Sequence, residues 1–238
     1  MEGLERYIPF LFGGLWVTLG VSIAGLAVAF FTAFTFGLIR SYAPTPARWA
    51  ATGFVEFFRG TSALVQLFWA FYVLPFFGLT LAPYLVGILV LGLNQGSYGS
   101  EIVRGSIAAV PKGQLDAARA LRMPPMARLR RVVLPQALPI MIPPFGNMAI
   151  SMLKFTSLLS AVTVQDLTSR AQTTRTDIGE SALIFGSILL VYFALSLIIS
   201  SITRLIERRT SIEGKYRSRS TKSVTAAGTR TSTEAVPS

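Results

Sequence analysis

The side chains that most often carry enzyme chemistry are absent from this 238-residue sequence or scattered through it. It contains neither histidine nor cysteine, so we expect no zinc or haem site, no disulfide and no histidine-based acid–base catalysis. The 11 acidic residues are scattered along the chain and suggest no catalytic constellation. No Gly-x-x-x-x-Gly-Lys-Ser/Thr phosphate loop occurs, so the chain is not expected to hydrolyse ATP itself. These features predict a non-catalytic protein.

The polar groups that could contact a small solute lie inside long apolar segments. Lys154 is the one charged residue in segment 132–165, and a cation in lipid costs about 2.5–3.5 kcal/mol on insertion scales. With Thr156 and Ser157 close by, it could meet a substrate carboxylate in a cavity. Alternatively, Lys154 extends to the membrane interface, or it pairs with Glu101 or with another subunit.

A second polar cluster includes Asn94 and Gln95. Amide side chains within a membrane helix either join helices by hydrogen bonds or contact a ligand, and both alternatives stay open here. Glu101 and Arg104 are three residues apart, a spacing that predicts a structural ion pair on one helix face. Asn147 lies among prolines, where its side chain is expected to satisfy a freed carbonyl group.

The elements that must position these residues are predicted from hydropathy and charge. The chain is 52% hydrophobic and 14% charged, with a mean hydropathy of +0.56, so it has too few charged residues to cover a water-facing surface. Segments 7–39 and 60–100 carry no charge at all. This pattern excludes a soluble enzyme and predicts an all-α transmembrane protein with five membrane-spanning helices. The predicted spans lie within 7–39, 60–77, 84–105, 132–165 and 181–203.

Five spans place the two termini on opposite sides of the membrane. If the N-terminus is outside, segments 40–59, 101–131 and 204–238 are cytoplasmic and hold 18 of the 22 Lys and Arg residues, against three outside. The positive-inside rule therefore predicts a cytoplasmic C-terminus. The rule also explains the net charge of +11, so the charge does not require a nucleic-acid partner. Residues 210–238 are expected to form a disordered basic cytoplasmic tail. This tail either binds a partner or has no role beyond keeping the C-terminus on the cytoplasmic side.

The longest predicted cytoplasmic segment contains two short amphipathic helices. The first covers 115–121 and follows Gly113 and Gln114, and the second covers 126–133. Pro124 and Pro125 separate them. A pair of this kind could be held by a soluble partner or lie on anionic lipid, and the residues alone favour neither.

The loop resembles the Glu-Ala-Ala loop of ABC-importer permeases. That pattern is Glu-Ala-Ala, three residues, Gly, nine residues, Ile, one residue, Leu-Pro, and its spacing is matched by Asp116-Ala117-Ala118, Arg122, Val132 and Leu134-Pro135. The surrounding motifs are similar to the polar amino acid uptake subfamily: Phe58-Arg59-Gly60-Thr61, Leu64-Val65-Gln66-Leu67, Pro111 with Gly113-Gln114, and Lys154 with Thr156-Ser157-Leu158. The runs 94–101 and 143–147 look most like the ectoine/hydroxyectoine permeases of that subfamily.

The sequence departs from the family pattern at four positions. Asp116 replaces the Glu, Arg122 replaces the permissive Gly, Ser62 replaces a Pro, and Phe155 replaces an Asp that often follows the membrane Lys. The first two bear on the fit to an ATPase, and the other two bear on the membrane region.

The resemblance implies a permease subunit of an ATP-driven importer in the bacterial cytoplasmic (inner) membrane. Residues 1–209 would form the transmembrane domain, with a coupling loop at about 111–135. The expected partners are a cytoplasmic ABC ATPase dimer that binds ATP and Mg, a second identical or homologous permease, an extracytoplasmic solute-binding protein and the lipid bilayer, without nucleic acid and without a cofactor in this chain. The cargo would be polar amino acids or compatible solutes such as ectoine or hydroxyectoine.

The resemblance also implies two groups of site residues. Those coupled to the ATPase would be Gly113, Gln114, Asp116, Ala117, Ala118, Arg119, Leu121, Arg122, Leu134 and Pro135. Those along the substrate path would be Thr61, Gln66, Asn94, Gln95, Glu101, Asn147, Lys154, Thr156 and Ser157. The alternative, an ATP-independent channel or a structural membrane subunit, leaves the loop spacing unexplained.

Overall fold

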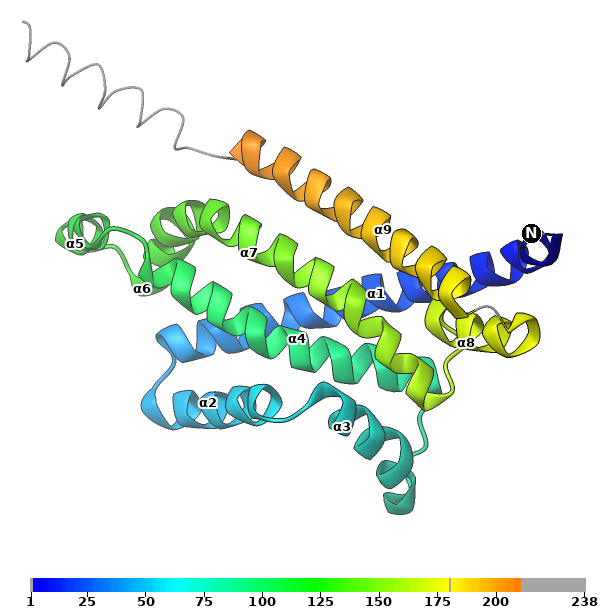
Figure 1. Ribbon diagram of the computed structural model, residues 1–238. Helices are drawn as coiled ribbons and strands as arrows, with labels where there is room; N and C mark the ends of the chain where they lie inside the picture. The colour runs from blue at the N-terminus through cyan, green and yellow to red at the C-terminus, as the bar shows by residue number, and fades with distance from the viewer. Residues whose placement is uncertain (1, 180, 211–238) are drawn as a thin grey trace, which may run out of the picture.

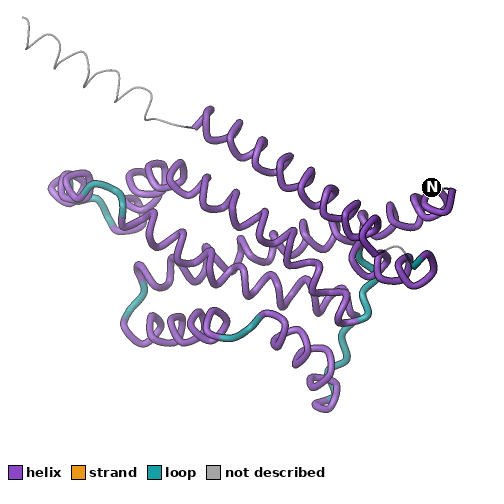
Figure 2. Tube along the Cα trace, in the orientation of Figure 1, coloured by secondary structure: helices purple, strands orange, loops and turns teal. Residues whose placement is uncertain are grey.

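The computed structural model describes residues 2–179 and 181–210. These residues form helices joined by short loops, with no strand among them (Figure 2), as the predicted all-α fold requires. Three helical segments are long and apolar enough to cross a membrane, namely Pro9–Tyr42, Pro125–Val162 and Ser181–Thr210. A bent pair, Thr45–Gly60 with Ala63–Phe77, is a fourth candidate.

The centre of the fold is the close pairing of α1 (Glu2–Tyr42) with α4 (Pro83–Ala108). A Cβ atom added to Gly92 would lie 3.0 Å from the carbonyl oxygen of Gly25, and one added to Gly96 would lie 2.8 Å from that of Ala29. The two backbones can approach this closely only because these positions lack side chains, as in many membrane helix pairs.

The predicted second span is preceded by a further helix, from which a sharp bend separates it. Helix α2 (Thr45–Gly60) occupies most of the segment predicted as a cytoplasmic loop, and α3 (Ala63–Phe68) follows after a bend of 100°. A π-helical turn, η1 (Trp69–Val73), and a 3-10 turn, η2 (Leu74–Phe77), complete the element. The helical segment predicted at 60–77 thus corresponds to Ala63–Phe77, whereas α2 and the bend before this stretch were not predicted.

Polar side chains account for the bend between α2 and α3. A break leaves carbonyl groups without helical partners. The Asn94 and Gln66 amide nitrogens donate to the carbonyl oxygen of Phe58 at 2.9 and 3.0 Å. Gln66 also donates to the Thr61 hydroxyl oxygen at 2.6 Å. Hydropathy alone could not reveal a break that depends on a residue from another helix.

The predicted pair of short loop helices is half confirmed. Helix α5 (Lys112–Ala120) matches the first. The second is not separate, because α6 (Pro125–Arg128), the π turn η3 (Leu129–Val133), α7 (Leu134–Phe155) and the 3-10 turn η4 (Thr156–Val162) run on as one segment. The π turn directly precedes Pro135, which has no N–H to donate to the previous helical turn.

Helix α8 (Leu167–Ile178) was not predicted, whereas α9 (Ser181–Thr210) extends the predicted last span. Asp166 begins α8 by accepting hydrogen bonds from the backbone N–H groups of Ser169 at 2.9 Å and Thr168 at 3.2 Å. Burial raises the pKa of the Asp166 carboxyl to about 6, although these bonds oppose the shift. Gly179 ends the helix with φ +79°.

The helices are arranged so that the two ends of the molecule differ (Figure 1). The N-terminal end of α1 and helix α8 lie at one end, and α5 projects beyond α4 and α7 at the other. The five predicted spans correspond to α1, the bent pair, α4, the α6–η4 segment and α9, but α4 is not apolar enough to count as a span by composition. The number five stays a prediction, and the predicted tail beyond Thr210 lies outside the described residues.

Candidate functional site

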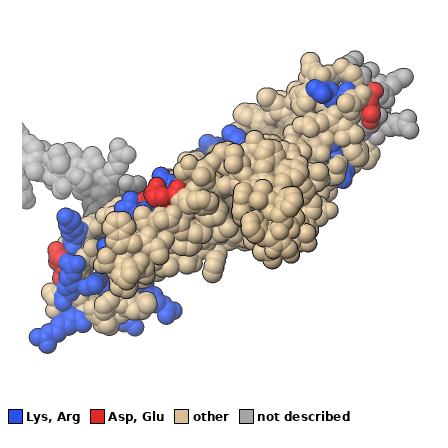
Figure 3. Space-filling model, turned by 90° about the horizontal axis from the view of Figure 1, so that it is seen from below, with Lys and Arg blue, Asp and Glu red and all other residues tan. Residues whose placement is uncertain are grey.

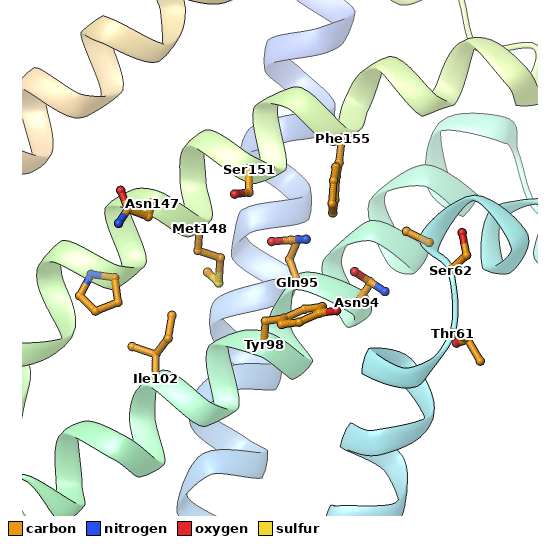
Figure 4. Close-up of a pocket in the computed structure, with 12 residues that line it drawn as sticks. Thr61, Ser62, Asn94, Gln95, Tyr98, Ile102, Asn147, Met148, Ser151 and Phe155 are labelled. Carbon is orange, nitrogen blue, oxygen red and sulfur yellow. The ribbon is translucent and has the colours of Figure 1, made fainter.

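A pocket of about 520 Å³ lies where the α2–α3 bend, α4 and α7 meet (Figure 4). Three segments that are distant in the sequence therefore share one cavity. Its lining mixes hydroxyl, amide and apolar side chains: Thr61, Ser62, Ala63, Asn94, Gln95, Tyr98, Ile102, Pro144, Asn147, Met148, Ser151 and Phe155. Four of the predicted substrate-path residues are among them, namely Thr61, Asn94, Gln95 and Asn147.

Gln95 is the polar group of the pocket that is best placed to contact a solute. The residue is 4% exposed, and no hydrogen bond from its side chain to another described residue is present. Figure 4 shows the amide pointing from α4 into the space below Ser151 and Phe155 of α7. The amide nitrogen and oxygen are not among the fully buried atoms without a partner, so they are open to the pocket, where a solute or water can bond to them.

Asn94 has a different role from its neighbour. Its amide nitrogen donates to the Phe58 carbonyl oxygen and, at 3.2 Å, to the side-chain oxygen of Gln66. The Asn94 and Gln66 side chains thus hold the α2–α3 bend in place. For Asn94, the alternative in which an amide joins helices is therefore the one that the structure shows. Gln66 is not part of the pocket lining.

The other predicted path residues on α7 and η4 lie outside the pocket lining. The hydroxyl groups of Thr156 and Ser157 donate to the backbone carbonyls of Leu153 and Lys154, at 2.7 and 2.8 Å. The Lys154 side chain is exposed on the molecule. It follows the lining residue Ser151 by three residues on α7, so the two positions are neighbours on that helix, but Lys154 itself does not line the pocket.

Glu101 is a structural residue that ties three helices together. Its Oε1 accepts from Arg40 of α1 at 2.7 Å and from Arg59 of α2 at 3.2 Å. Its Oε2 accepts from Arg104 at 2.7 Å, so the predicted pair of Glu101 with Arg104 is confirmed. The alternative pair of Glu101 with Lys154 is not formed. Arg40 and Arg59 were not predicted to take part, because nothing in the sequence shows that α1 and α2 converge there.

The predicted coupling region presents apolar side chains at the end of the molecule. Leu121 is 77% exposed and Met126 is 73% exposed, both beside α5. Asp116 and Arg119 are also exposed and form an ion pair with each other at 2.8 Å. Ala118 faces inward and is buried within this chain. Among the remaining predicted residues, Leu134 is half-buried. The exposed ones are Gly113, Gln114, Ala117 and Pro135.

Arg122 has an unusual backbone conformation at the end of α5. Its φ is +52°, in the left-handed region that favours glycine. The N–H of Met123 donates to the carbonyl of Ala118 at 3.1 Å, and the N–H of Arg122 donates to that of Arg119 at 2.8 Å. This pair of bonds is a Schellman motif, whose left-handed position is normally glycine. Arg122, which stands where the family pattern has glycine, is therefore the residue whose backbone this turn strains.

Known proteins resemble this chain over most of its length. The family described as the binding-protein-dependent transport system inner membrane component matches residues 25–212. The probable amino-acid ABC transporter permease y4tF of Sinorhizobium fredii is 42% identical over 207 residues, which cover 84% of this chain and 87% of that protein. The L-cystine permease TcyB of Bacillus subtilis is 36% identical and covers 86% and 88%.

A solved structure has the same fold. A chain of an amino acid ABC transporter with histidines superposes with a TM-score of 0.81 at 30% identity, and the match covers 87% of this chain and 96% of that one. The region matched to the family includes the pocket and the loop around α5. This chain therefore belongs to the family of inner membrane components of binding-protein-dependent transport systems, as a non-catalytic, multi-pass permease subunit of an ABC transporter.

Proposed function

We propose that this permease carries amino acids into the cell and that the pocket between the α2–α3 bend, α4 and α7 is part of their path. The observation that carries the proposal is Gln95, a nearly buried amide without a protein partner that points into this pocket. Pockets of this volume suit a small polar solute. Relatives named for amino-acid, L-cystine and glutamine transport support amino acids as cargo.

Ectoine is a second candidate cargo. The two runs that resemble ectoine/hydroxyectoine permeases, 94–101 and 143–147, both contribute to the pocket. Asn94, Gln95 and Tyr98 come from the first, and Pro144 and Asn147 come from the second. Ectoine carries a carboxylate and no net charge, as most amino acids do, so the same amide groups could bind it.

The energy for import would come from a cytoplasmic ABC ATPase dimer at α5. An exposed apolar pair, Leu121 and Met126, beside charged side chains suits insertion into a groove of a soluble partner. The exposed ion pair of Asp116 with Arg119 lies beside it. These charges would align the loop with the ATPase surface rather than add affinity. A second permease and an extracytoplasmic binding protein would complete the importer.

Reconstituted transport tests the proposal. The complete importer in liposomes is given ATP and an equimolar mixture of the twenty amino acids with ectoine, and the accumulated solutes are identified by mass spectrometry. We expect accumulation of one or more amino acids that stops when ATP is omitted. Accumulation of ectoine alone would favour the second cargo, and accumulation without ATP would favour a channel.

Leu121→Asp tests the coupling role of the loop. It places a charge where an apolar groove is expected, so co-purification of the ATPase and ATP-driven uptake should both fall about tenfold or more. Leu121 is highly exposed in this chain, so expression should stay normal. Leu121→Met, which keeps an apolar side chain of similar volume, is the matched control and should keep both activities. Normal uptake by Leu121→Asp would show that coupling lies elsewhere.

A further inference from the structure

The charges around the pocket point to a further property of the transport path. We infer that this chain selects its cargo by charge: it admits amino acids whose net charge is zero or negative and disfavours cationic ones. The inference rests on the proposed function, because it concerns the same pocket. Its basis is that no acidic side chain of residues 2–179 or 181–210 lines the pocket, whereas the charged groups next to it are cations in excess.

Glu101 is the carboxylate nearest to the pocket along α4, and it is fully occupied. Each of its two oxygens accepts from guanidinium groups, Oε1 from Arg40 and Arg59 and Oε2 from Arg104. Glu56 lies 3.5 Å from Arg59 and adds a second carboxylate. Three guanidinium groups against two carboxylates leave one positive charge in excess. A cationic solute would find no free acid here.

Arg59 brings this charge to the boundary of the pocket. Its guanidinium carbon lies 5.4 Å from the centre of the Tyr98 ring, and the Tyr98 hydroxyl donates to the Arg59 carbonyl oxygen at 3.3 Å. Tyr98 lines the pocket, as Figure 4 shows. The Nε atom of Arg59 is buried without a hydrogen-bond partner, while its Nη1 pairs with Glu56 and Glu101. The side chain is 32% exposed, so water screens part of the excess charge, and the remainder acts at the pocket boundary.

Lys154 is a second cation in the neighbourhood, on α7. It is exposed and does not line the pocket, but it follows the lining residue Ser151 by three positions, and no ion pair of Lys154 with a described residue is present. A solute carboxylate that enters between α4 and α7 would therefore meet the positive potential of Arg59 and, outside the lining, that of Lys154. A lysine or arginine side chain in the same place would lose its hydration without gaining an acidic partner.

Binding to the permease–ATPase complex without the binding protein tests this selection, because the binding protein then cannot act as the filter. L-Citrulline and L-arginine are a matched pair of probes, since they are similar in size and differ by one charge. L-Glutamine and L-glutamate are a second pair. In calorimetric titrations, we expect at least one of citrulline, glutamine and glutamate to bind about tenfold or more tightly than arginine.

A carboxylate placed in the pocket should reverse the preference. Gln95→Glu should weaken binding of the neutral and anionic probes about tenfold or more and strengthen binding of arginine. Gln172→Glu is the matched control, because it makes the same change at an exposed site on α8 outside the pocket, and it should change nothing. If Gln95→Glu does not assemble with the ATPase, Ser151→Asp introduces a carboxylate from α7 instead.

Three results would overturn the inference: arginine binding to the unaltered complex as tightly as each of citrulline, glutamine and glutamate, an unchanged preference in the carboxylate variants, or no binding of any probe. None of them is the failure of the proposed function. That failure would be the absence of ATP-driven accumulation of any amino acid by the complete importer.

Discussion

Two adjacent amides show how much of the site depends on positions that only the fold defines. Asn94 and Gln95 differ by one step along α4, yet Asn94 holds the α2–α3 bend while Gln95 points into the pocket. Successive residues of a helix point about 100° apart, so neighbours face different surroundings. The sequence could predict a polar cluster in a membrane helix. It could not assign the roles, because these depend on where Phe58 and Gln66 lie.

Arg122→Gly should stabilise the protein. A non-glycine residue at φ +52° is strained by roughly 1 kcal/mol or more, and glycine relieves this strain at the cost of extra freedom in the unfolded chain. We expect a net gain of about 0.5–1 kcal/mol, seen as a higher midpoint of thermal unfolding. Arg122→Ala removes the same charge but keeps the strain, so it should bring no such gain. Equal stabilisation by both variants would assign the effect to charge instead.

At the scale of the helices, the close contact between α1 and α4 depends on glycine. A Cβ atom at Gly96 would lie 2.8 Å from the Ala29 carbonyl oxygen, so Gly96→Ala must push two backbones apart. We expect a loss of about 1–3 kcal/mol in stability. Gly105→Ala makes the same change on the same helix where nothing lies within 4 Å, and it should be neutral or slightly stabilising. Comparing their unfolding midpoints in detergent checks this, and similar losses would show that close packing is not the cause.

Among the elements, the long apolar helices were predictable, and the helix breaks were not. A run of apolar residues bounded by charges reports a span directly, as for α1 and α9. The bend at 61–62 needs Asn94 from α4, and no local pattern marks it strongly. Helix α8 did have local signals, Asp166 as its N-cap and Gly179 after its end, but its polar composition made the segment resemble a loop. Capping residues would have identified it where hydropathy did not.

Over the whole molecule, positive charge gathers at one end. Figure 3 shows Lys and Arg side chains concentrated at the end where α5 lies, and few along the apolar middle. Arg128, Arg130 and Arg131 lie in the same connection between α5 and α7. The opposite end, with α8, carries Arg170 and Arg175. Within the described residues, the structure thus brings the cationic loop between α4 and α7, which the sequence assigned to the cytoplasm, to one end.

This distribution predicts that the end with α5 is cytoplasmic and that α8 is outside, since cationic loops remain on the cytoplasmic side, and the charge of the sequence predicts a cytoplasmic C-terminus as well. The chain has no cysteine, so single cysteines can report on each side without background. Thr176→Cys places a thiol at an exposed site on α8, and Ser238→Cys places one at the C-terminus. In spheroplasts, a membrane-impermeant maleimide should label Thr176→Cys, whereas Ser238→Cys should react only after the membrane is permeabilised. Labelling of both after permeabilisation controls for reactivity. Reaction of Ser238→Cys in intact spheroplasts would show that the C-terminus is outside and that charge does not set the orientation of this permease.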